Sequence, residues 1–310
     1  MLIEDAQLLN LFGVDVYAYG LFVAIGVLAC LVYLAINGKK TLKTGTAPLM
    51  ALCMVAGGFL LSRLMFVFLD GSMRNYVTLN GLLYIRGGGY SMYGALLGAV
   101  LAALTVGKVR GENLKKVLDL AVPGLLLFVL FARLGEKFTD IGISRPLLRV
   151  PDALKVFVTV GEYDSYISTY LLESIAALML YVMCICIKAK KRPDGTAANL
   201  TMMVFAAVQT LLESLRFDQH MKFSFVGVQQ VLSMVLLIAM VLFFAIRLAK
   251  KDYLIASIVY LVCLMGAVVA LEFLIDRSGL SRTVLYSVYA VLLALPCAGG
   301  WRMSRLAEKE

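Results

Sequence analysis

The chain alternates between long apolar runs and short polar segments. A hydrophobic stretch of about 20 residues crosses a hydrocarbon core of about 30 Å as a helix. Backbone polar groups in lipid must bond within their own segment, which favours helices over isolated strands. The pattern predicts an all-α polytopic membrane protein with about nine transmembrane helices. These lie at roughly residues 18–36, 48–69, 90–107, 117–134, 166–187, 198–215, 225–247, 253–275 and 281–300.

Composition supports this interpretation, because 61% of the residues are hydrophobic and only 16% are charged. The first fifteen residues carry Glu4, Asp5 and Asp15 and lack a basic region, so we expect no removable signal peptide. The net charge is +9, but the basic residues are dispersed over short loops rather than gathered on a soluble domain. We therefore expect no nucleic-acid partner.

The basic residues alternate between the loops in a way that predicts orientation. More than half of the 29 Lys and Arg fall in five segments, namely 37–43, 108–116, 188–192, 247–251 and 301–310. Short loops rich in Lys and Arg face the cytoplasm. The intervening segments hold acidic residues such as Asp70, Asp140 and Asp152. We expect the N-terminus outside and the C-terminus in the cytoplasm.

One segment between the predicted spans is long, at residues 136–165 between the fourth and fifth. Its two prolines, Pro146 and Pro151, and its scattered aliphatic residues are typical of a small folded cap or an interfacial helix. The orientation places this cap on the outer face.

The six cysteines all fall within apolar runs and form no cluster with metal-ligand spacing. We expect no metal site and no cofactor.

Polar side chains gather toward the outer ends of the predicted spans. Ionisable residues within membrane spans cost about 2.5 to 3.5 kcal/mol each when central, so they are the first place to look for function. Here they are Arg63, Arg133, Glu173, Glu213 and Arg216. Tyr19 opens the first span and the glycines at 87–89 precede the third, at the same depth.

Each residue alone has a structural explanation. Arg63 or Arg216 can extend to the interface, and Tyr19 can belong to an interfacial aromatic belt. Glu213 and Arg216 are three residues apart and can pair with each other. The glycines can serve close helix packing. Jointly, however, arginines beside a glycine backbone suit a phosphate. An anionic ligand at this depth is a phospholipid.

These segments resemble the prolipoprotein diacylglyceryl transferase family. The resemblance covers residues 12 to about 248, in the family's order and at compatible spacing. It is carried by AYGLFVAIG at 18–26, LSRLMFVF at 61–68, GGYSMYGALLG at 88–98, ARLGEKFTDIGISR at 132–145, and LLESLRFDQ at 211–219 followed by VQQVLS at 228–233.

The resemblance implies an enzyme that moves the diacylglyceryl group of phosphatidylglycerol onto the lipobox cysteine thiol of a prelipoprotein. It implies a seven-helix core over residues 1–250, with residues 251–310 forming two additional helices and a basic tail. We expect an outer-facing lipid chamber lined by the first six spans. The implied catalytic residues are Arg133, Tyr93 and Glu136, and the implied substrate-binding residues are Tyr19, Arg63, Gly88, Gly89, Ser91, Gln209, Glu213 and Arg216.

Three positions depart from the family pattern. The family histidine in the glycine-rich segment is Tyr93, the first asparagine of the signature is Glu136, and an arginine four residues before Glu213 is Gln209. Two interpretations follow. Either Tyr93 and Glu136 take over the roles of the missing groups, or the chain is a paralogue that keeps the lipid chamber and acts as a lipid-binding or lipid-handling accessory protein.

Overall fold

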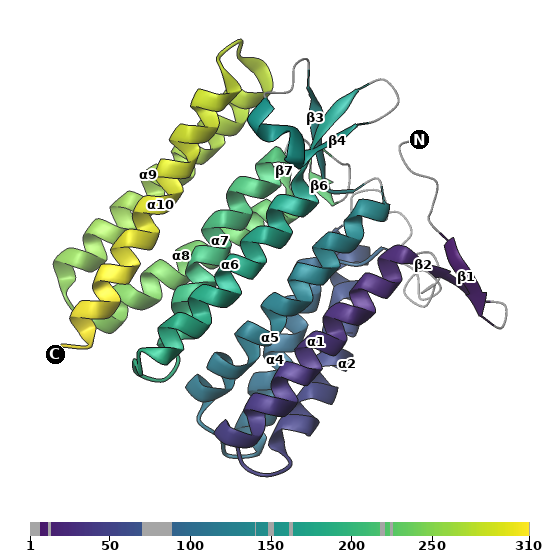
Figure 1. Cartoon of the computed structure of the whole chain (residues 1–310). Helices are drawn as coiled ribbons and strands as arrows, with labels where there is room; N and C mark the ends of the chain where they lie inside the picture. Colours follow the sequence, from purple (N-terminus) through teal and green to yellow (C-terminus); the bar gives the residue numbers. More distant parts are fainter. Residues whose placement is uncertain are drawn as a thin grey trace.

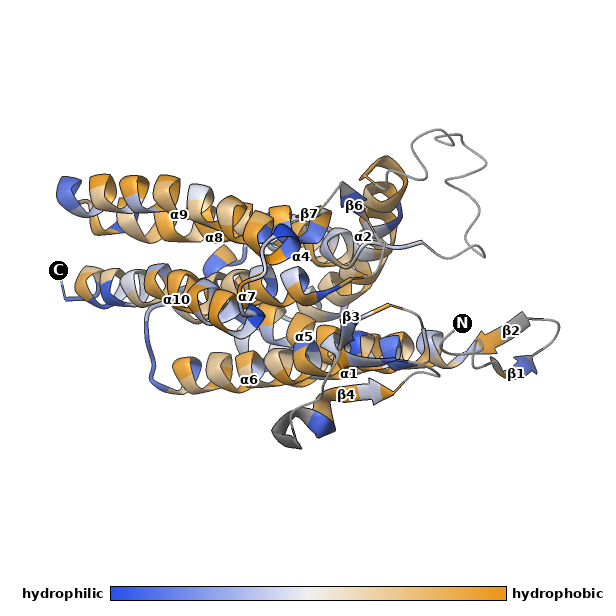
Figure 2. Cartoon of the chain, turned by 90° about the horizontal axis from the view of Figure 1, so that it is seen from above, coloured by the Kyte–Doolittle hydropathy of each residue, from blue (hydrophilic) through white to orange (hydrophobic). Residues whose placement is uncertain are grey.

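The computed structural model describes residues 7–11, 14–69, 89–139, 141–147, 152–160, 164–217, 221–223 and 226–309. Within these ranges nine helices are long and apolar enough to cross a membrane, which confirms the all-α polytopic prediction. They are α1 (Ala18–Thr41), α2 (Thr46–Leu69), α4 (Met92–Val109), α5 (Leu114–Gly135), α6 (Thr169–Ala189), α7 (Thr196–Leu215), α8 (Val228–Leu248), α9 (Lys251–Arg277) and α10 (Arg282–Ala307). In Figure 2, hydrophobic residues run along the outer helices α1, α6 and α9.

The helices form two groups that share α5, α6 and α7 as a central layer (Figure 1). Helix α1 packs mainly against α5, and α2 packs mainly against α4. On the other side, α8 and α10 pack against α7, and α9 packs on α8 and α10. Consecutive helices α1 and α2 therefore belong to different pairs.

Glycine governs the contact between α2 and α4. A Cβ on Gly94 would lie 2.6 Å from the carbonyl oxygen of Leu61, and one on Gly98 would overlap the backbone of Gly57. Small residues let two helix backbones approach closely in a membrane. The part of the glycine-rich segment that enters α4 thus serves close helix packing.

The small strands and short helices lie at one end of the bundle. Strands β1 (Gln7–Leu11) and β2 (Val14–Tyr17) form an antiparallel hairpin before α1. Strands β3 (Ile143–Leu147), β4 (Val158–Val160) and β5 (Ser165–Ser168) form an antiparallel sheet in the order β3-β5-β4. The 3₁₀ helices η3 (Glu136–Phe138) and η4 (Asp152–Phe157) accompany it, and β6 (Lys222–Phe223) pairs with β7 (Val226–Gly227). The described part of 136–165 is therefore a folded cap.

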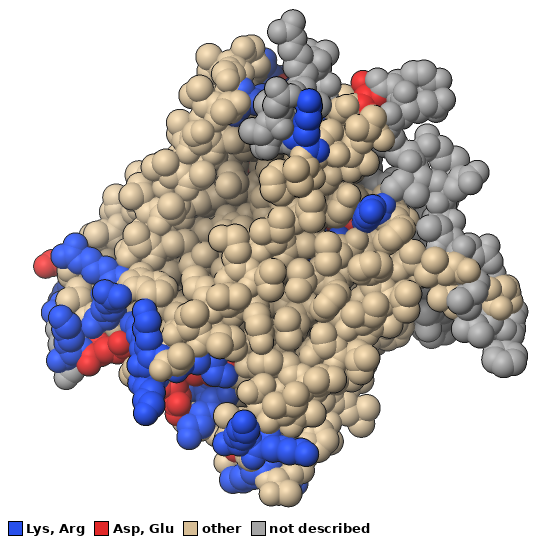
Figure 3. Space-filling view, in the orientation of Figure 1, with Lys and Arg blue, Asp and Glu red and all other residues tan. Residues whose placement is uncertain are grey.

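Lys and Arg gather at the opposite end of the bundle, at the lower left of Figure 3. This end holds the loops that join α1 to α2, α4 to α5, α6 to α7 and α8 to α9, together with the end of α10. The cap and the basic loops are thus separated by the length of the helices. This distribution agrees with the predicted orientation, which remains a prediction.

Candidate lipid and thiol site

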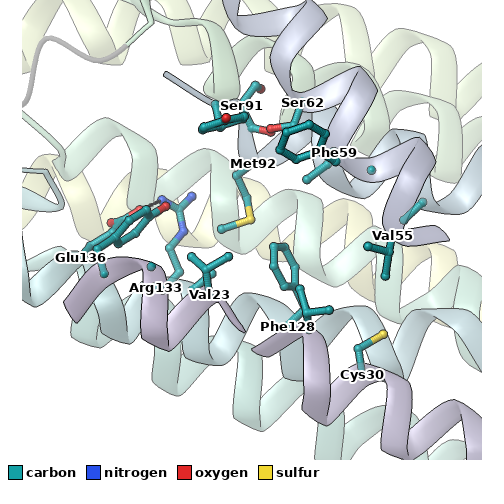
Figure 4. Close-up of a pocket in the computed structure, with 18 of the residues that line it drawn as sticks. Val23, Cys30, Val55, Phe59, Ser62, Ser91, Met92, Phe128, Arg133 and Glu136 are labelled. Atoms are coloured by element: carbon teal, nitrogen blue, oxygen red, sulfur yellow. Dashed lines mark hydrogen bonds and ion pairs between the residues drawn. The ribbon is translucent and has the colours of Figure 1, made fainter. Parts of the chain in front are cut away.

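A cavity of about 1030 Å³ separates the α1–α5 pair from the α2–α4 pair, at the end that carries the cap. Its polar lining comes from Tyr19, Ser62, Ser91, Arg133, Glu136, Thr139 and Gln229. Its apolar lining runs along α1 from Val23 to Leu34, and the distance from Tyr19 to Leu34 is about 22 Å at 1.5 Å per residue. In Figure 4, Arg133 and Glu136 lie at one end of the cavity and Cys30 lies toward the other end. The cavity therefore suits a molecule with a polar head and long apolar chains.

The mouth of the cavity opens sideways between α1 and α2. Three of its lining residues, Tyr17, Val55 and Phe59, are 44%, 41% and 49% exposed. Val55 and Phe59 are apolar and lie within α2, on the surface that a membrane would cover, and Tyr17 directly precedes α1. A lipid could therefore enter from the bilayer without crossing water.

The glycine-rich segment forms one wall of the cavity through Gly89 and Ser91. Gly89 has a φ of +77°, and a Cβ there would overlap the ring of Phe66. Glycine is required here because both the left-handed backbone and the space exclude a side chain. The Ser91 amide donates to the Ser62 carbonyl at 3.1 Å, and Ser62 Oγ donates to the Ser91 carbonyl at 2.8 Å. Gly88 lies outside the described residues.

Arg63 holds this glycine turn in place. Its Nη1 donates to the carbonyl oxygen of Gly89 at 2.8 Å. Its guanidinium carbon lies 5.9 Å and 5.6 Å from the ring centres of Phe66 and Tyr90, within range of a cation–π interaction. The side chain is buried but does not line the cavity. Arg63 is therefore placed behind the wall.

Arg133 is the centre of a buried network of charged groups. Its Nη1 lies 2.6 Å from Glu136 Oε1, and its Nε lies 2.5 Å from Glu173 Oε2. Arg216 joins the same two acids, because its Nη1 lies 3.2 Å from Glu136 Oε2 and 3.2 Å from Glu173 Oε1. All four side chains are no more than 6% exposed. Two guanidinium groups thus bridge two carboxyl groups inside the bundle.

Two further residues extend this network on α7. Gln209 Nε2 lies 3.4 Å from Glu173 Oε2 and 3.4 Å from Glu213 Oε2. Glu213 Oε2 lies 4.0 Å from Arg216 Nε, so these two residues pair as their spacing suggested, in addition to their wider contacts. Among the described residues, the network contains three carboxyl groups and two guanidinium groups, so its acids outnumber its arginines by one.

A chain of hydrogen bonds links Tyr93 to Arg133. The Tyr93 hydroxyl is hydrogen bonded to Ser233 Oγ, and Ser233 Oγ donates to the Gln229 carbonyl at 2.6 Å. Gln229 Oε1 accepts from Arg133 Nη2 at 3.2 Å. Tyr93 is buried and does not line the cavity. Among the described residues, its hydroxyl is therefore connected to Arg133 through Ser233 and Gln229, which accepts one bond with its backbone carbonyl and the other with its side chain.

The structure thus brings the proposed site residues to one end of the bundle but gives them different places. Tyr19, Gly89, Ser91, Arg133 and Glu136 line the cavity. Arg63, Tyr93, Gln209, Glu213 and Arg216 do not line it and lie in the shell behind. The prediction that the first six spans line the chamber is wrong for the fifth and sixth, α6 and α7, which supply buried acids instead of cavity wall.

Two site residues escaped the sequence interpretation. Gln229 lines the cavity on α8, and its only signal was the Gln-Gln pair at the start of an apolar run. Gly142 has a φ of +79°, and a Cβ there would lie 2.6 Å from Glu136 Oε2. A glycine is therefore needed to let the cap backbone pass beside the Glu136 carboxyl group.

Comparisons with known proteins identify the family. The family model for prolipoprotein diacylglyceryl transferase matches residues 6–246. A phosphatidylglycerol–prolipoprotein diacylglyceryl transferase of Clostridium tetani is 25% identical over 249 residues, covering 79% of this chain and 98% of the relative. Proteins of the same name from Finegoldia magna and Dehalococcoides mccartyi are 22% and 26% identical, covering 76% and 75% of this chain and 92% and 90% of their own lengths. The chain belongs to the prolipoprotein diacylglyceryl transferase family.

Proposed function

We propose that this protein transfers the diacylglyceryl group of phosphatidylglycerol to the lipobox cysteine thiol of prelipoproteins. Its relatives carry these two substrates in their names. The observation that carries the proposal is the cavity with Arg133 and Glu136 at its polar end and an apolar wall along α1. The lipid would place its acyl chains along that wall and its phosphate near Arg133.

The reaction is a nucleophilic displacement at the carbon of the diacylglyceryl group that is bonded to the phosphate oxygen. The thiol loses its proton, and the sulfur forms a bond to this carbon as the bond from carbon to the phosphate oxygen breaks. The products are a thioether and glycerol phosphate, and the thiol proton is left over. A base is needed because the thiolate, not the thiol, is the nucleophile.

Glu136 is the carboxyl group placed to accept that proton, because it alone among the three acids of the network lines the cavity. Protonation of Glu136 removes the charge that holds Arg133 Nη1 at 2.6 Å. Arg133 is then able to form a charge-assisted hydrogen bond with the departing phosphate. Proton uptake by Glu136 and stabilisation of the departing phosphate by Arg133 are thus coupled, because the two side chains form one ion pair.

Tyr93 and Gln209 serve a supporting role in this scheme. The Tyr93 hydroxyl keeps Gln229 against Arg133 through Ser233. Gln209 lies between the carboxyl groups of Glu173 and Glu213. An arginine in this position would add a positive charge, whereas glutamine leaves the excess carboxyl group available to hold a proton.

We further propose that the protein lies in the bacterial inner membrane with the cap and the cavity's polar end outside. The basic loops at the other end would face the cytoplasm. This orientation lets a secreted precursor present its cysteine to the cavity. Residues 1–250 would form the transferase core, and residues 251–310 would add a helix pair and a basic tail.

A reconstituted assay tests the proposal. The purified protein in vesicles containing phosphatidylglycerol is mixed with a lipobox peptide, and mass spectrometry measures the diacylglyceryl thioether. We expect transfer by the wild type and a loss of kcat of about 100-fold or more in Glu136→Gln, the usual contribution of a positioned base. Glu112→Gln is the matched control, because Glu112 is solvent-accessible near the basic end, where it accepts from the Lys43 amide at 2.8 Å.

The assay also separates the enzyme from the accessory protein. Retention of phosphatidylglycerol without thioether formation, in wild-type protein that is folded, would replace the transferase with the lipid-handling role. Equal turnover by Glu136→Gln and wild type would reject Glu136 as the proton acceptor.

A further inference from the structure

Helices α9 and α10 lie beyond the part of the chain that the family model matches, which ends at residue 246. They nevertheless pack against α7 and α8, which carry Glu213 and Gln229. We propose that this helix pair positions Gln229 for the transfer reaction, through a buried contact made by Glu272 and Tyr289. The inference rests on the proposed function and adds two positioning residues to it.

The contact joins α8 to both added helices. Gln230 Nε2 donates to Glu272 Oε1 of α9 at 2.5 Å and to the Tyr289 hydroxyl of α10 at 3.1 Å. The three residues are only 4%, 7% and 0% exposed in the order Gln230, Glu272, Tyr289. Both N–H groups of the amide are therefore used in a dry setting. A carboxyl group in a membrane helix is costly, so simple packing does not explain Glu272.

Gln230 is adjacent to the residue that contacts Arg133. Gln229 accepts from Arg133 Nη2 at 3.2 Å, while Gln230 turns to the added helices. Both lie in the first turn of α8, where Gly227 provides no side-chain cap. A helix terminus without a cap frays more easily. The contact with Glu272 therefore fixes the turn that presents Gln229.

Two more contacts reach the neighbourhood of Arg216. The Tyr286 hydroxyl of α10 donates to the carbonyl oxygen of Ser214 at 3.1 Å. Arg145 of β3 lies 2.5 Å from Asp276 of α9. The preceding residue of β3, Ser144, forms a backbone bridge with Arg216. The added helices thus contact the end of α7 and strand β3, the two segments next to Arg216 of the buried network.

The other end of the same helix pair provides a matched control. Arg192 Nη2 lies 2.9 Å from Glu308 Oε1, close to the end of α10. Nineteen residues separate Tyr289 from Glu308, which corresponds to about 28 Å along a helix. A general loss of packing of α9 and α10 would disturb the contact of Glu272 and the contact of Glu308 alike. The proposed positioning of the site depends only on the contact of Glu272.

The experiment compares Glu272→Leu, Glu272→Gln and Glu308→Gln in the full chain. Displacement of a contact near the chemistry costs up to about 100-fold in rate. We expect Glu272→Leu to lower kcat by about tenfold to 100-fold, with KM for phosphatidylglycerol within about twofold of wild type. Glutamine at 272 can still accept from Gln230, so Glu272→Gln is expected to restore most of kcat, and Glu308→Gln is expected to match wild type.

Hydrogen exchange provides a readout that does not need turnover. Amides of residues 226–234 are expected to exchange faster in Glu272→Leu than in wild type, and at the wild-type rate in Glu308→Gln. If Glu272→Leu does not fold, Tyr289→Phe replaces it, with an expected loss of kcat of about threefold from one neutral hydrogen bond and the same change in exchange.

The outcomes are distinguishable. Absence of transfer by wild-type protein rejects the proposed function, while the exchange comparison still tests the contact. The inference is overturned if the wild-type protein is active and Glu272→Leu has the same kcat and the same hydrogen exchange as wild type. The same result in Tyr289→Phe, where that variant replaces Glu272→Leu, also overturns it. An equal loss of kcat in Glu272→Leu and Glu308→Gln also overturns it, because that result indicates general docking.

Discussion

The two sides of the bundle are both apolar, yet one encloses a cavity and the other, between α7, α8, α9 and α10, packs as one hydrophobic core among the described residues; we call this second side the solid flank. Around the cavity, residues at the walls are often small, as at Gly58, Ala95 and Ala99. Between α7, α8, α9 and α10, large side chains such as Phe244, Leu264 and Tyr289 are almost completely buried against one another. The two sides thus differ in how completely their helices close on one another, although hydrophobic residues line both.

The same comparison explains how the ion network stays in place. The acids and arginines lie between the two sides, on α5, η3, α6 and α7 and at Arg216, the residue that follows α7. A cavity on one flank gives access to Arg133 and Glu136, and the solid flank holds Gln229 and Arg216. Substitutions on the cavity side and substitutions in the solid flank should therefore have different effects on transfer and on stability.

The largest expected effect comes from Arg133→Ala, which removes the guanidinium group from the cavity. We expect transfer to fall at least about 100-fold, since the departing phosphate loses its electrostatic partner. Arg192→Ala is the matched change on the solid flank, where Arg192 pairs with Glu308. It should retain most of the turnover. The reconstituted thioether assay measures both, and normal turnover by membrane-inserted Arg133→Ala would contradict the role given to Arg133.

Adding bulk should distinguish the two flanks by stability. Ala245 is fully buried in the solid flank, and Ala245→Leu should lower the free energy of unfolding by about 1 to 3 kcal/mol through overpacking. Ala95 lines the cavity and is only partly buried, so Ala95→Leu should be tolerated in stability. Instead it should reduce transfer from lipids with long acyl chains more than from short ones. Thermal unfolding in detergent and transfer from lipids of defined chain length test the pair; equal destabilisation would contradict the contrast.

Glycine-to-alanine changes test the close approach of α2 and α4. A Cβ at Gly98 would lie 2.8 Å from Leu61 Cβ and would overlap the Gly57 backbone. We expect Gly98→Ala to cost about 1 to 3 kcal/mol. Gly266 of α9 has no atom within 4 Å of its Cβ position, so Gly266→Ala should be neutral or slightly stabilising. Melting temperatures in detergent check the order of the two variants.

The smallest effect is expected from Tyr93→Phe, which removes the hydrogen bond to Ser233. One neutral hydrogen bond contributes about 0.5 to 1.5 kcal/mol, which corresponds to a loss of about threefold to tenfold in turnover if it acts only by positioning. Tyr260→Phe, which loses a hydrogen bond to the Leu292 carbonyl in the solid flank, should leave turnover unchanged. A loss of more than about 100-fold in Tyr93→Phe would assign the hydroxyl a direct part in proton transfer.

Much of this arrangement could be predicted from the sequence. The apolar runs predicted the helices to within a few residues, because only helices satisfy the backbone in lipid. Arg133 was recognisable as an ionisable group at the end of a span, and Glu136 was identified through the family resemblance; both line the cavity. Gly89 was recognisable because it belongs to a run of three glycines directly before a membrane span, where glycine is unfavourable without a specific role.

The partners within the site could not be predicted. Periodicity gives the face of a helix but not its neighbour, so the pairing of Arg133 with Glu173 across two helices had no sequence signal. The same limit hid the roles of Gln229 and Gly142, and it explains why α6 and α7 were expected to form cavity wall. Which helices pack closely and which leave a cavity between them depends on the residues at the helix contacts and on packing over the whole bundle.

The sideways opening beside Tyr17, Val55 and Phe59 has a kinetic consequence. A substrate that arrives through such an opening is delivered by two-dimensional diffusion, so its effective concentration is the fraction of the bilayer that it occupies. Saturation of the enzyme should then follow the mole fraction of phosphatidylglycerol in the vesicle and be independent of how many vesicles are suspended per millilitre. The composition of the surrounding membrane thereby becomes a direct control over the rate at which precursors acquire their lipid.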